Sequence, residues 1–292
     1  MKYRFYSTAI KTFARLPLRA MYLLSDVAAL TLHRLVGYRV EVVRKNLAMA
    51  FPEKSDKERR QIEKQFYRHL CDIFIETAKL AHISDAEAAR RVRVSGMEHI
   101  NDAVDAGQSV VLLLGHFGNW EWVTAMAPEI SSRALSSEIY HPLRDKAFDR
   151  LMLDLRTRFG TENIPMNNAV RRLLEVHRSG RPFVCGFISD QRPFSRELKN
   201  WTDFLGIDTA YVNGGEVIGS KIGARFLYVD MEPRRRGYYD LTIKPLKAIE
   251  DGEPNPYTRA YLRELEQSIR RTPWAWLWSH NRWKRRRDIQ AQ

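Results

Sequence analysis

A chain of 292 residues with 44% hydrophobic content can bury a sizeable core. It contains no internal repeat or Pro/Gly/Ser-rich linker, and its two cysteines, Cys71 and Cys185, form no disulfide or metal-binding framework. No metal site is evident in the sequence, and no cofactor is expected. The net charge of +13 predicts attraction to an anionic partner, such as nucleic acid, an anionic membrane face, a phosphorylated lipid or an acidic carrier protein.

The segment at residues 16–36 is mostly apolar but is interrupted by charged residues, so it is neither a clean membrane span nor a signal peptide. Arg19, Asp26 and His33 follow one another at intervals of seven, nearly two helical turns, and therefore form one narrow polar stripe. The rest of the helix surface is apolar. Such a helix suits the membrane interface, but it also suits packing on the protein core, and the sequence does not decide between the two.

Helices and strands alternate after this segment. A helix is predicted at residues 55–82, where Ser55 and Glu58 form a plausible capping box. Strands are predicted at 109–114, 135–140, 182–188, 225–230 and 238–244, and helices at 144–158, 166–178, 214–222 and 255–271. This order is typical of an α/β fold with a mainly parallel mixed sheet flanked by helices, in which the last strand forms an antiparallel hairpin.

The most informative motif is V-L-L-L-G-H-F-G-N-W-E-W, a buried strand that ends at His116 and continues as a helix carrying Glu121. On one continuous helix these two side chains would diverge by about 140°, so they meet only if His116 lies on the turn and Glu121 in the first helical turn. Gly118 permits a tight backbone there, and Asn119 is a good N-cap. A carboxylate beside an imidazole orients the ring and raises its basicity, as a general base requires. The alternative is a boundary histidine followed by a glutamate that stabilises a helix N-terminus.

Other charged residues follow later elements of the fold. Asp190 and Arg192 come just after the third predicted strand, and Arg156 and Arg158 end the first helix after the motif. Parallel sheets usually carry their chemistry beyond the carboxyl ends of the strands, so we expect His116 and Asp190 at the same edge. One acidic and several basic groups around His116 fit the attack of a hydroxyl on a thioester, in which an oxyanion forms. Each feature alone is also typical of helix capping.

The C-terminal segment is rich in tryptophan and arginine. Trp274, Trp276, Trp278 and Trp283 nearly alternate with polar residues, which suits either a membrane–water boundary or a strand with one buried aromatic face. The basic run at residues 282–287 suits either attraction to an anionic membrane or a solvated tail.

The H-F-G-N-W-E segment resembles the H-x-x-x-x-D/E box of the lysophospholipid acyltransferase superfamily. From Tyr38 to Lys284 the chain is similar to the lipid A biosynthesis lauroyl/myristoyl acyltransferases of Gram-negative bacteria. The resemblance is carried by Y-R-V-E-V-V-R-K-N-L, G-H-F-G-N-W-E, L-R-T-R-F-G, S-D-Q and W-L-W-S-H-N-R-W-K, in this order. It implies a glycerolipid acyltransferase-like fold, with a membrane-associating segment at residues 1–54 and an acyltransferase domain at residues 55–292.

The resemblance also implies a reaction and a location. A fatty acyl chain passes from an acyl carrier protein thioester to a hydroxyl of a lipid A precursor, at the cytoplasmic face of the inner membrane. Because the polar stripe interrupts the N-terminal helix, we expect peripheral or monotopic attachment. An acyltransferase that uses a lysophospholipid or an amino-acid lipid would show the same motifs. A nucleic-acid-binding protein would explain the charge, but no recognition motif for nucleic acid is evident, so none is expected as a partner.

Residue roles follow from the same resemblance. The family's catalytic residues correspond to His116, Glu121, Arg156 and Asp190. In the expected mechanism His116 removes the proton from the acceptor hydroxyl, Glu121 holds the imidazole ring, and no acyl-enzyme forms. Arg156 stabilises the oxyanion or a phosphate, and Asp190 orients an arginine or the substrate. The expected substrate-binding residues are Asn119, Tyr140, Arg158 and Arg192.

Overall fold

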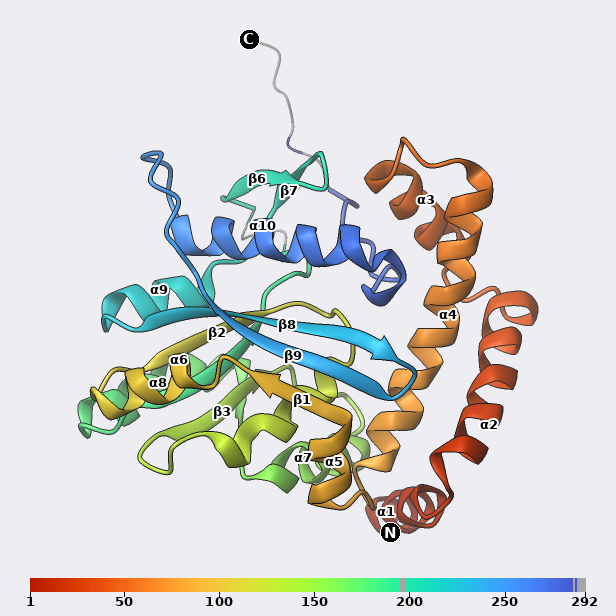
Figure 1. Cartoon of the computed structure of the whole chain (residues 1–292), viewed down its shortest axis with the longest axis horizontal. Coiled ribbons are helices and arrows are strands. Elements are labelled where there is room, and N and C mark those ends of the chain that lie inside the picture. Colours follow the sequence, from red (N-terminus) through yellow and green to blue (C-terminus); the bar gives the residue numbers. More distant parts are fainter. Residues whose placement is uncertain (195–197, 286, 288–292) are drawn as a thin grey trace.

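The computed structural model describes residues 1–194, 198–285 and 287 of the chain. Seven strands form one sheet in the order β1-β9-β8-β2-β5-β3-β4, in which every neighbouring pair is parallel except β8 and β9 (Figure 1). They are β1 (Val92–Ser95), β2 (Val110–Leu114), β3 (Leu135–Tyr140), β4 (Glu162–Pro165), β5 (Phe183–Ile188), β8 (Arg225–Arg235) and β9 (Tyr238–Pro245). A separate antiparallel pair is formed by β6 (Trp201–Phe204) and β7 (Ile207–Ala210). The predicted mainly parallel mixed sheet and its antiparallel hairpin are confirmed.

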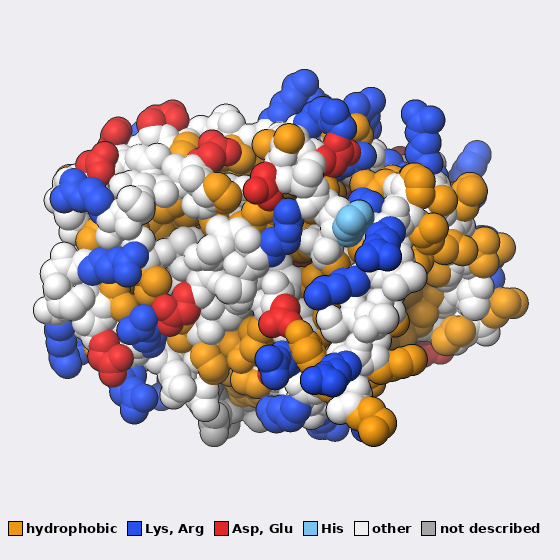
Figure 2. Space-filling model, turned by 90° about the horizontal axis from the view of Figure 1, so that it is seen from below, with side chains coloured by type: hydrophobic (Ala, Val, Ile, Leu, Met, Phe, Trp, Pro, Cys, Tyr) orange, Lys and Arg blue, Asp and Glu red, His pale blue; other side chains and the backbone are white. Residues whose placement is uncertain are grey.

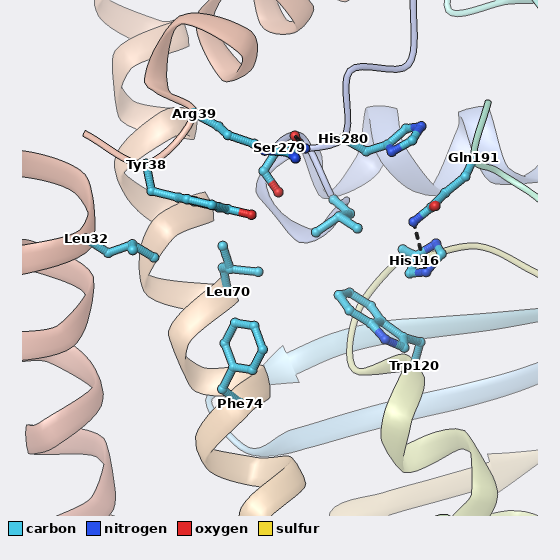
Figure 3. A pocket seen from close by; sticks show the side chains of 11 residues that line it. Leu32, Tyr38, Arg39, Leu70, Phe74, His116, Trp120, Gln191, Ser279 and His280 are labelled. Atoms are coloured by element: carbon cyan, nitrogen blue, oxygen red, sulfur yellow. Dashed lines mark hydrogen bonds between the residues drawn. The ribbon is translucent and has the colours of Figure 1, made fainter. Parts of the chain in front are cut away.

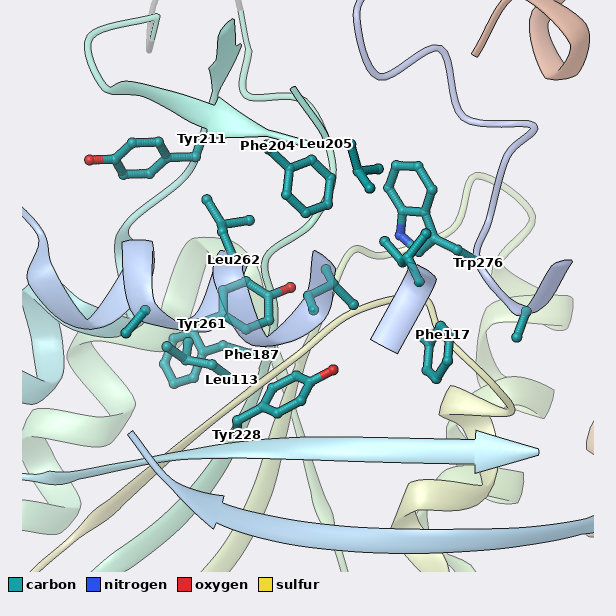
Figure 4. Close-up of a cluster of buried hydrophobic side chains, with 14 of the residues drawn as sticks. Leu113, Phe117, Phe187, Phe204, Leu205, Tyr211, Tyr228, Tyr261, Leu262 and Trp276 are labelled. Atoms are coloured by element: carbon teal, nitrogen blue, oxygen red, sulfur yellow. The ribbon is translucent and has the colours of Figure 1, made fainter. Parts of the chain in front are cut away.

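Helices cover both faces of the main sheet (Figure 1). They are α1 (Lys2–Ala14), α2 (Leu18–Leu30), α3 (Val40–Ala50), α4 (Asp56–Lys79), α5 (Asp85–Arg91), α6 (Glu98–Asp105), α7 (Lys146–Arg156), α8 (Ala169–Arg178), α9 (Gly214–Lys221) and α10 (Pro256–Arg271). Side chains of β2 alternate between two buried clusters: Val111 and Leu113 pack with residues of α8, α9 and α10, and Leu112 packs with residues of α6 and α7. Because both faces of β2 are covered, its sequence is apolar at every position. Figure 4 shows part of the first cluster.

Helix α4 connects the sheet to the N-terminal helices. It begins with the predicted capping box, in which Ser55 Oγ accepts a hydrogen bond from the Glu58 amide and the Glu58 carboxylate accepts one from the Ser55 amide at 2.7 Å. In Figure 1 this helix runs along one end of the sheet, with α2 on its outer side. It therefore lies between the N-terminal segment and the edge of the sheet.

The structure answers the question that the sequence left open about α2. Asp26 binds Arg68 of α4 at 2.9 Å and Arg236 of the β8–β9 hairpin at 2.9–3.0 Å. His33, in the π-helical turn Thr31–Leu35 that continues α2, binds Glu63 of α4 at 2.6 Å. Arg19 is exposed and does not share these contacts. The polar stripe thus fastens the helix to the protein.

Because the polar stripe binds α4 and the β8–β9 hairpin, an apolar face of the N-terminal helices points outward. Ten of the eighteen exposed large hydrophobic side chains in the described residues lie within residues 1–38. They include Leu23, Leu24, Val27 and Leu30 on α2. Figure 2 shows hydrophobic side chains gathered at this end of the molecule, on the right. Among the described residues, no helix is both long enough and apolar enough to cross a membrane.

The C-terminal tryptophans belong to the core, so the membrane–water boundary interpretation of this segment is wrong. Trp276, Trp278 and Trp283 are buried, and each donates its indole N–H to a protein oxygen. The segment is not a strand either, since it contains a 3-10 turn (Pro273–Ala275) and makes only an isolated bridge between Trp276 and Phe117. Arg282 is buried as well. Arg286, in the predicted basic run, lies outside the described residues.

Candidate active site

A tight turn after β2 presents His116. Gly118 has φ +62°, and a Cβ there would lie 1.8 Å from the Met231 carbonyl oxygen, so no other residue fits without rearrangement. Asn119 caps the next helix as predicted, because its side-chain oxygen accepts a hydrogen bond from the Trp122 amide at 3.3 Å. That helix (Trp120–Glu129) is a 3-10 helix and not an α-helix. The predicted strand–turn–helix joint is therefore present.

The imidazole of His116 is held by Asp190, at the end of the neighbouring strand. Asp190 Oδ1 lies 2.7 Å from His116 Nδ1, and Oδ2 accepts hydrogen bonds from the His116 amide at 2.9 Å and from Trp276 Nε1 at 2.7 Å. The pairing of β2 with β5 explains this contact. Leu114 is opposite Ile188 in the parallel register, so two residues further on His116 and Asp190 are side by side.

Asp190 is buried yet remains a carboxylate. Burial alone would raise its pKa, but the electrostatic interaction and hydrogen bonds with His116, together with the Trp276 hydrogen bond, outweigh burial and lower the pKa of Asp190 to about 2. An ionised Asp190 accepts the Nδ1 proton, which leaves Nε2 as the basic nitrogen. Gln191 Nε2 lies 3.3 Å from that nitrogen.

Glu121 does not hold the imidazole, and this corrects the expected arrangement. Its carboxylate forms a two-pronged ion pair with Arg156 at the end of α7, with distances of 2.8 Å from Nε and 2.6 Å from Nη2. Asp190 takes the place expected for Glu121, so it orients the base and not an arginine. The reason is geometric: Glu121 lies on the far side of the N-cap and faces α7, whereas His116 faces the end of β5.

Glu138 of β3 is a third member of the charged group around Arg156. Its carboxylate lies 3.7 Å from Arg156 Nε, and one of its oxygens has no hydrogen-bond partner among the described residues. Burial raises the pKa of Glu138 to about 7, although the charge of Arg156 opposes this. Arg156 is therefore paired with Glu121 and also lies beside Glu138, so it is not an unpaired cation.

His116 lies in a groove of about 530 Å³ between the N-terminal helices, α4 and the C-terminal segment (Figure 3). Its apolar walls are Leu32, Leu70, Phe74, Trp120 and Leu277. Its polar wall consists of Tyr38, Arg39, His116, Gln191, Ser279 and His280. The Trp120 ring packs edge-to-face on the His116 imidazole, with ring centroids 5.1 Å apart. The groove thus combines a base with room for an apolar chain.

A base held by a carboxylate, at the polar end of an apolar groove, is consistent with chemistry on a lipid. Residues 3–285 match the family model of the bacterial lipid A biosynthesis acyltransferases. The chain belongs to this family. It is an enzyme, an acyltransferase, and the family resemblance noted from its motifs is confirmed.

Curated relatives agree with this assignment at low identity. The acyltransferase is 23% identical to a lipid A biosynthesis acyltransferase of Haemophilus influenzae, over 83% of this chain and 75% of the relative. It is 26% identical to the lipid A biosynthesis palmitoleoyltransferase of Escherichia coli, over 85% and 79% of the two chains. It is 24% identical to the lauroyltransferase of the same organism, over 87% and 81%.

The expected substrate-binding residues of the acyltransferase are distributed over several places. Asn119 is fully buried, donates to Glu76 at 2.6 Å and does not line the groove. Arg158 pairs with Asp85 at 2.9 Å. Tyr140 is half-buried at the end of β3, the strand that also carries Glu138.

Arg192 lies near the groove, because its amide donates to His280 Nε2 at 3.1 Å. Sequence reasoning gave no role to Arg39, Gln191 or His280, although all three line the groove. They stand inside the Y-R, S-D-Q and W-S-H-N segments that carry the family resemblance, and this was the available signal.

Proposed function

We propose that this acyltransferase moves a fatty acyl chain from an acyl carrier protein thioester to a hydroxyl of a lipid A precursor, with His116 as general base. The observation that carries the proposal is the His116–Asp190 pair at the polar wall of an apolar groove. With Nδ1 engaged by Asp190, Nε2 is free to take the hydroxyl proton. The side-chain amide of Gln191 lies 3.3 Å from Nε2. The acceptor hydroxyl would either displace this amide or form a hydrogen bond with it.

The reaction is a direct transfer. Nε2 of His116 takes the proton from the acceptor hydroxyl while the oxygen forms a bond to the thioester carbonyl carbon. The carbon–sulfur bond then breaks, and the leaving thiolate receives the proton from the imidazolium. Neither cysteine serves as an intermediate nucleophile, because both are buried and burial raises the pKa of Cys71 to about 11 and that of Cys185 to about 12.

The Glu121–Arg156 pair is proposed to support this centre from the helix that follows the His116 turn, which carries Glu121. Glu121 fixes the planar guanidinium in one orientation through two hydrogen bonds. Arg156 then presents its remaining N–H groups to the oxyanion or to an anionic group of the acceptor.

Charge and shape support the choice of substrates. An excess of positive charge attracts both an acidic carrier protein and a phosphorylated lipid. The apolar walls of the groove suit an acyl chain. The two Escherichia coli relatives are named for different acyl chains, so the length of the transferred acyl chain differs between members of the family. A lysophospholipid or an amino-acid lipid is the second candidate acceptor, since His116 can deprotonate any hydroxyl that reaches it.

An in vitro transfer assay tests the proposal. Purified enzyme is given acyl carrier protein thioesters or acyl coenzyme A, with a lipid A precursor or a lysophospholipid as acceptor. We expect the carrier protein donor and the lipid A precursor to give the highest kcat/KM. Equal or higher kcat/KM with the lysophospholipid would contradict the assigned acceptor.

The proposed location is the cytoplasmic face of the inner membrane, with the apolar face of α2 in contact with the lipid. Six basic residues and one acidic residue lie within residues 1–38, and the acidic one, Asp26, is paired with Arg68 and Arg236 of the same chain. Arg15, Arg19 and Arg34 are exposed beside the apolar face. An apolar face bordered by arginines fits an anionic bilayer surface.

Substituting Val27 by Glu should weaken binding to vesicles that contain anionic phospholipid by at least about tenfold, because burial of a valine side chain in lipid is lost and a negative charge is added. Val217→Glu is the matched control: it lies on α9, at the opposite end of the molecule (Figure 1), and its exposure is similar, 57% against 64% for Val27. A flotation assay measures binding. Equal loss in both variants would contradict the assigned face.

A further inference from the structure

The carboxylate of Glu76 occupies a junction that the proposed reaction does not use. It is fully buried in α4, where α2, β9 and the turn that carries His116 meet. Three donors from these three elements point at it: Tyr22 Oη at 2.7 Å, Tyr239 Oη at 2.7 Å and Asn119 Nδ2 at 2.6 Å. Burial raises the pKa of Glu76 to about 7, although the three hydrogen bonds oppose this.

One branch of this junction reaches the catalytic turn. Asn119 follows His116 by three residues and caps the helix that carries Trp120 and Glu121. Two further contacts from α4 hold the same turn: Trp122 Nε1 donates to the Glu76 carbonyl at 2.9 Å, and His69 Nε2 lies 3.0 Å from the Gly118 carbonyl oxygen. The position of the turn is therefore set by α4.

The second branch reaches the helix with the exposed apolar face. Tyr22 belongs to α2, and its hydroxyl is the contact that joins this helix to Glu76. Ser25 donates to Asp72 of α4 at 2.6 Å, and Arg236 binds both Asp26 and Asp72. Polar contacts thus define the position of α2 on α4, while the apolar outer face of α2 remains exposed.

We propose that Glu76 is a positioning residue that makes the placement of His116 depend on how α2 is seated. This inference rests on the proposed function. A bilayer covers the outer face of α2 and favours its seated position, in which Tyr22 donates to Glu76. If Tyr22 leaves, a buried carboxylate loses one of its donors, and its remaining partners, Tyr239 and Asn119, must readjust. Because linkage is reciprocal, membrane contact at α2 stabilises the catalytic turn.

The test compares Tyr22→Phe with Tyr239→Phe. Each substitution removes one hydroxyl that donates to Glu76 at 2.7 Å, but Tyr22 lies on the proposed membrane-contacting helix and Tyr239 lies in the sheet. Transfer is measured with a water-soluble short-chain acceptor, alone and with added vesicles of phosphatidylethanolamine and phosphatidylglycerol. The readout is the ratio of kcat with vesicles to kcat without them.

We expect vesicles to raise kcat of the natural enzyme, and we expect Tyr22→Phe to reduce that ratio by about fivefold or more, the lower end of usual coupling between two sites. Tyr239→Phe should keep the ratio, even where kcat itself falls. Flotation should show that Tyr22→Phe still binds vesicles, since its apolar face is unchanged. Glu76→Gln, which keeps the shape of the side chain, should lower kcat with little change in KM.

Three results would overturn the inference: no stimulation of the natural enzyme by vesicles, an equal change of the ratio in both tyrosine variants, or no change in either. Failure of the proposed function is distinguishable from failure of this inference. It would appear as full activity of a His116→Ala variant both with and without vesicles, whatever the tyrosine variants do. Thermal unfolding of each variant separates a loss of folded protein from a loss of coupling.

Discussion

Replacing His116 by Ala should lower kcat at least ~10²-fold, the usual effect of losing a general base, while the protein should stay folded. The alanine removes the only imidazole that Asp190 holds at the groove, and no other described side chain hydrogen-bonds to that carboxylate except Trp276, which cannot accept a proton. The measurement is steady-state transfer from the acyl carrier protein thioester. Binding of the acceptor should change much less than kcat.

His177→Ala is the control for this experiment. His177 is exposed on α8, away from the groove, so its removal should leave kcat and KM unchanged. Full transferase activity of His116→Ala, with His177→Ala also active, would mean that His116 is not the base.

Replacing Asp190 by Asn should lower kcat by about 10²–10⁴-fold, although the side chain keeps its shape. An amide in this position donates to His116 Nδ1, and the ring proton then moves to Nε2, where the lone pair is needed. Nitrogen chemical shifts of the His116 ring measure the tautomer directly. We expect Asp190→Asn to change the tautomer and Glu121→Gln to leave it unchanged, because Glu121 binds Arg156 and not the ring.

The same variant has a consequence for acid stability. The pKa of Asp190 is lowered from 3.8 to about 2, so the folded state holds its proton less tightly than the unfolded state. The pair therefore contributes its full stabilisation above about pH 4, and this contribution is lost as the pH falls toward 2. Asp190→Asn should lack this pH-dependent step in thermal unfolding. A variant whose unfolding depends on pH as the natural protein does would contradict the lowered pKa.

Elements with strong local signals were predictable from the sequence. The capping box placed the start of α4, and continuous apolar runs identified β2 and β5 because both of their faces are buried. The short strands β1, β4, β6 and β7 were missed, since four residues carry too little periodicity. The tryptophan segment was misjudged because spacing alone does not say whether an aromatic side chain meets lipid or core.

The candidate site shows the same division. The turn at His116 and the N-cap after it were predictable, because Gly118 and Asn119, which form them, are close to His116 in the sequence. The partner of His116 does not: Glu121 was chosen because it is near in sequence, whereas Asp190 is 74 residues away. The orientation of α2 could not be predicted either, because its polar stripe could face water or protein. The contacts of Asp26 and His33 with α4 and the hairpin show that it faces protein.

What the sequence by itself determined is the class of fold, the family, and the histidine that we propose as the general base. Each rests on a local pattern or on an ordered set of motifs. Only the tertiary structure decided which carboxylate holds the imidazole, because strand order places β5 beside β2 and the register then brings Asp190 to His116. It also decided which face of α2 is free, since ion pairs between distant segments fix the rotation of that helix.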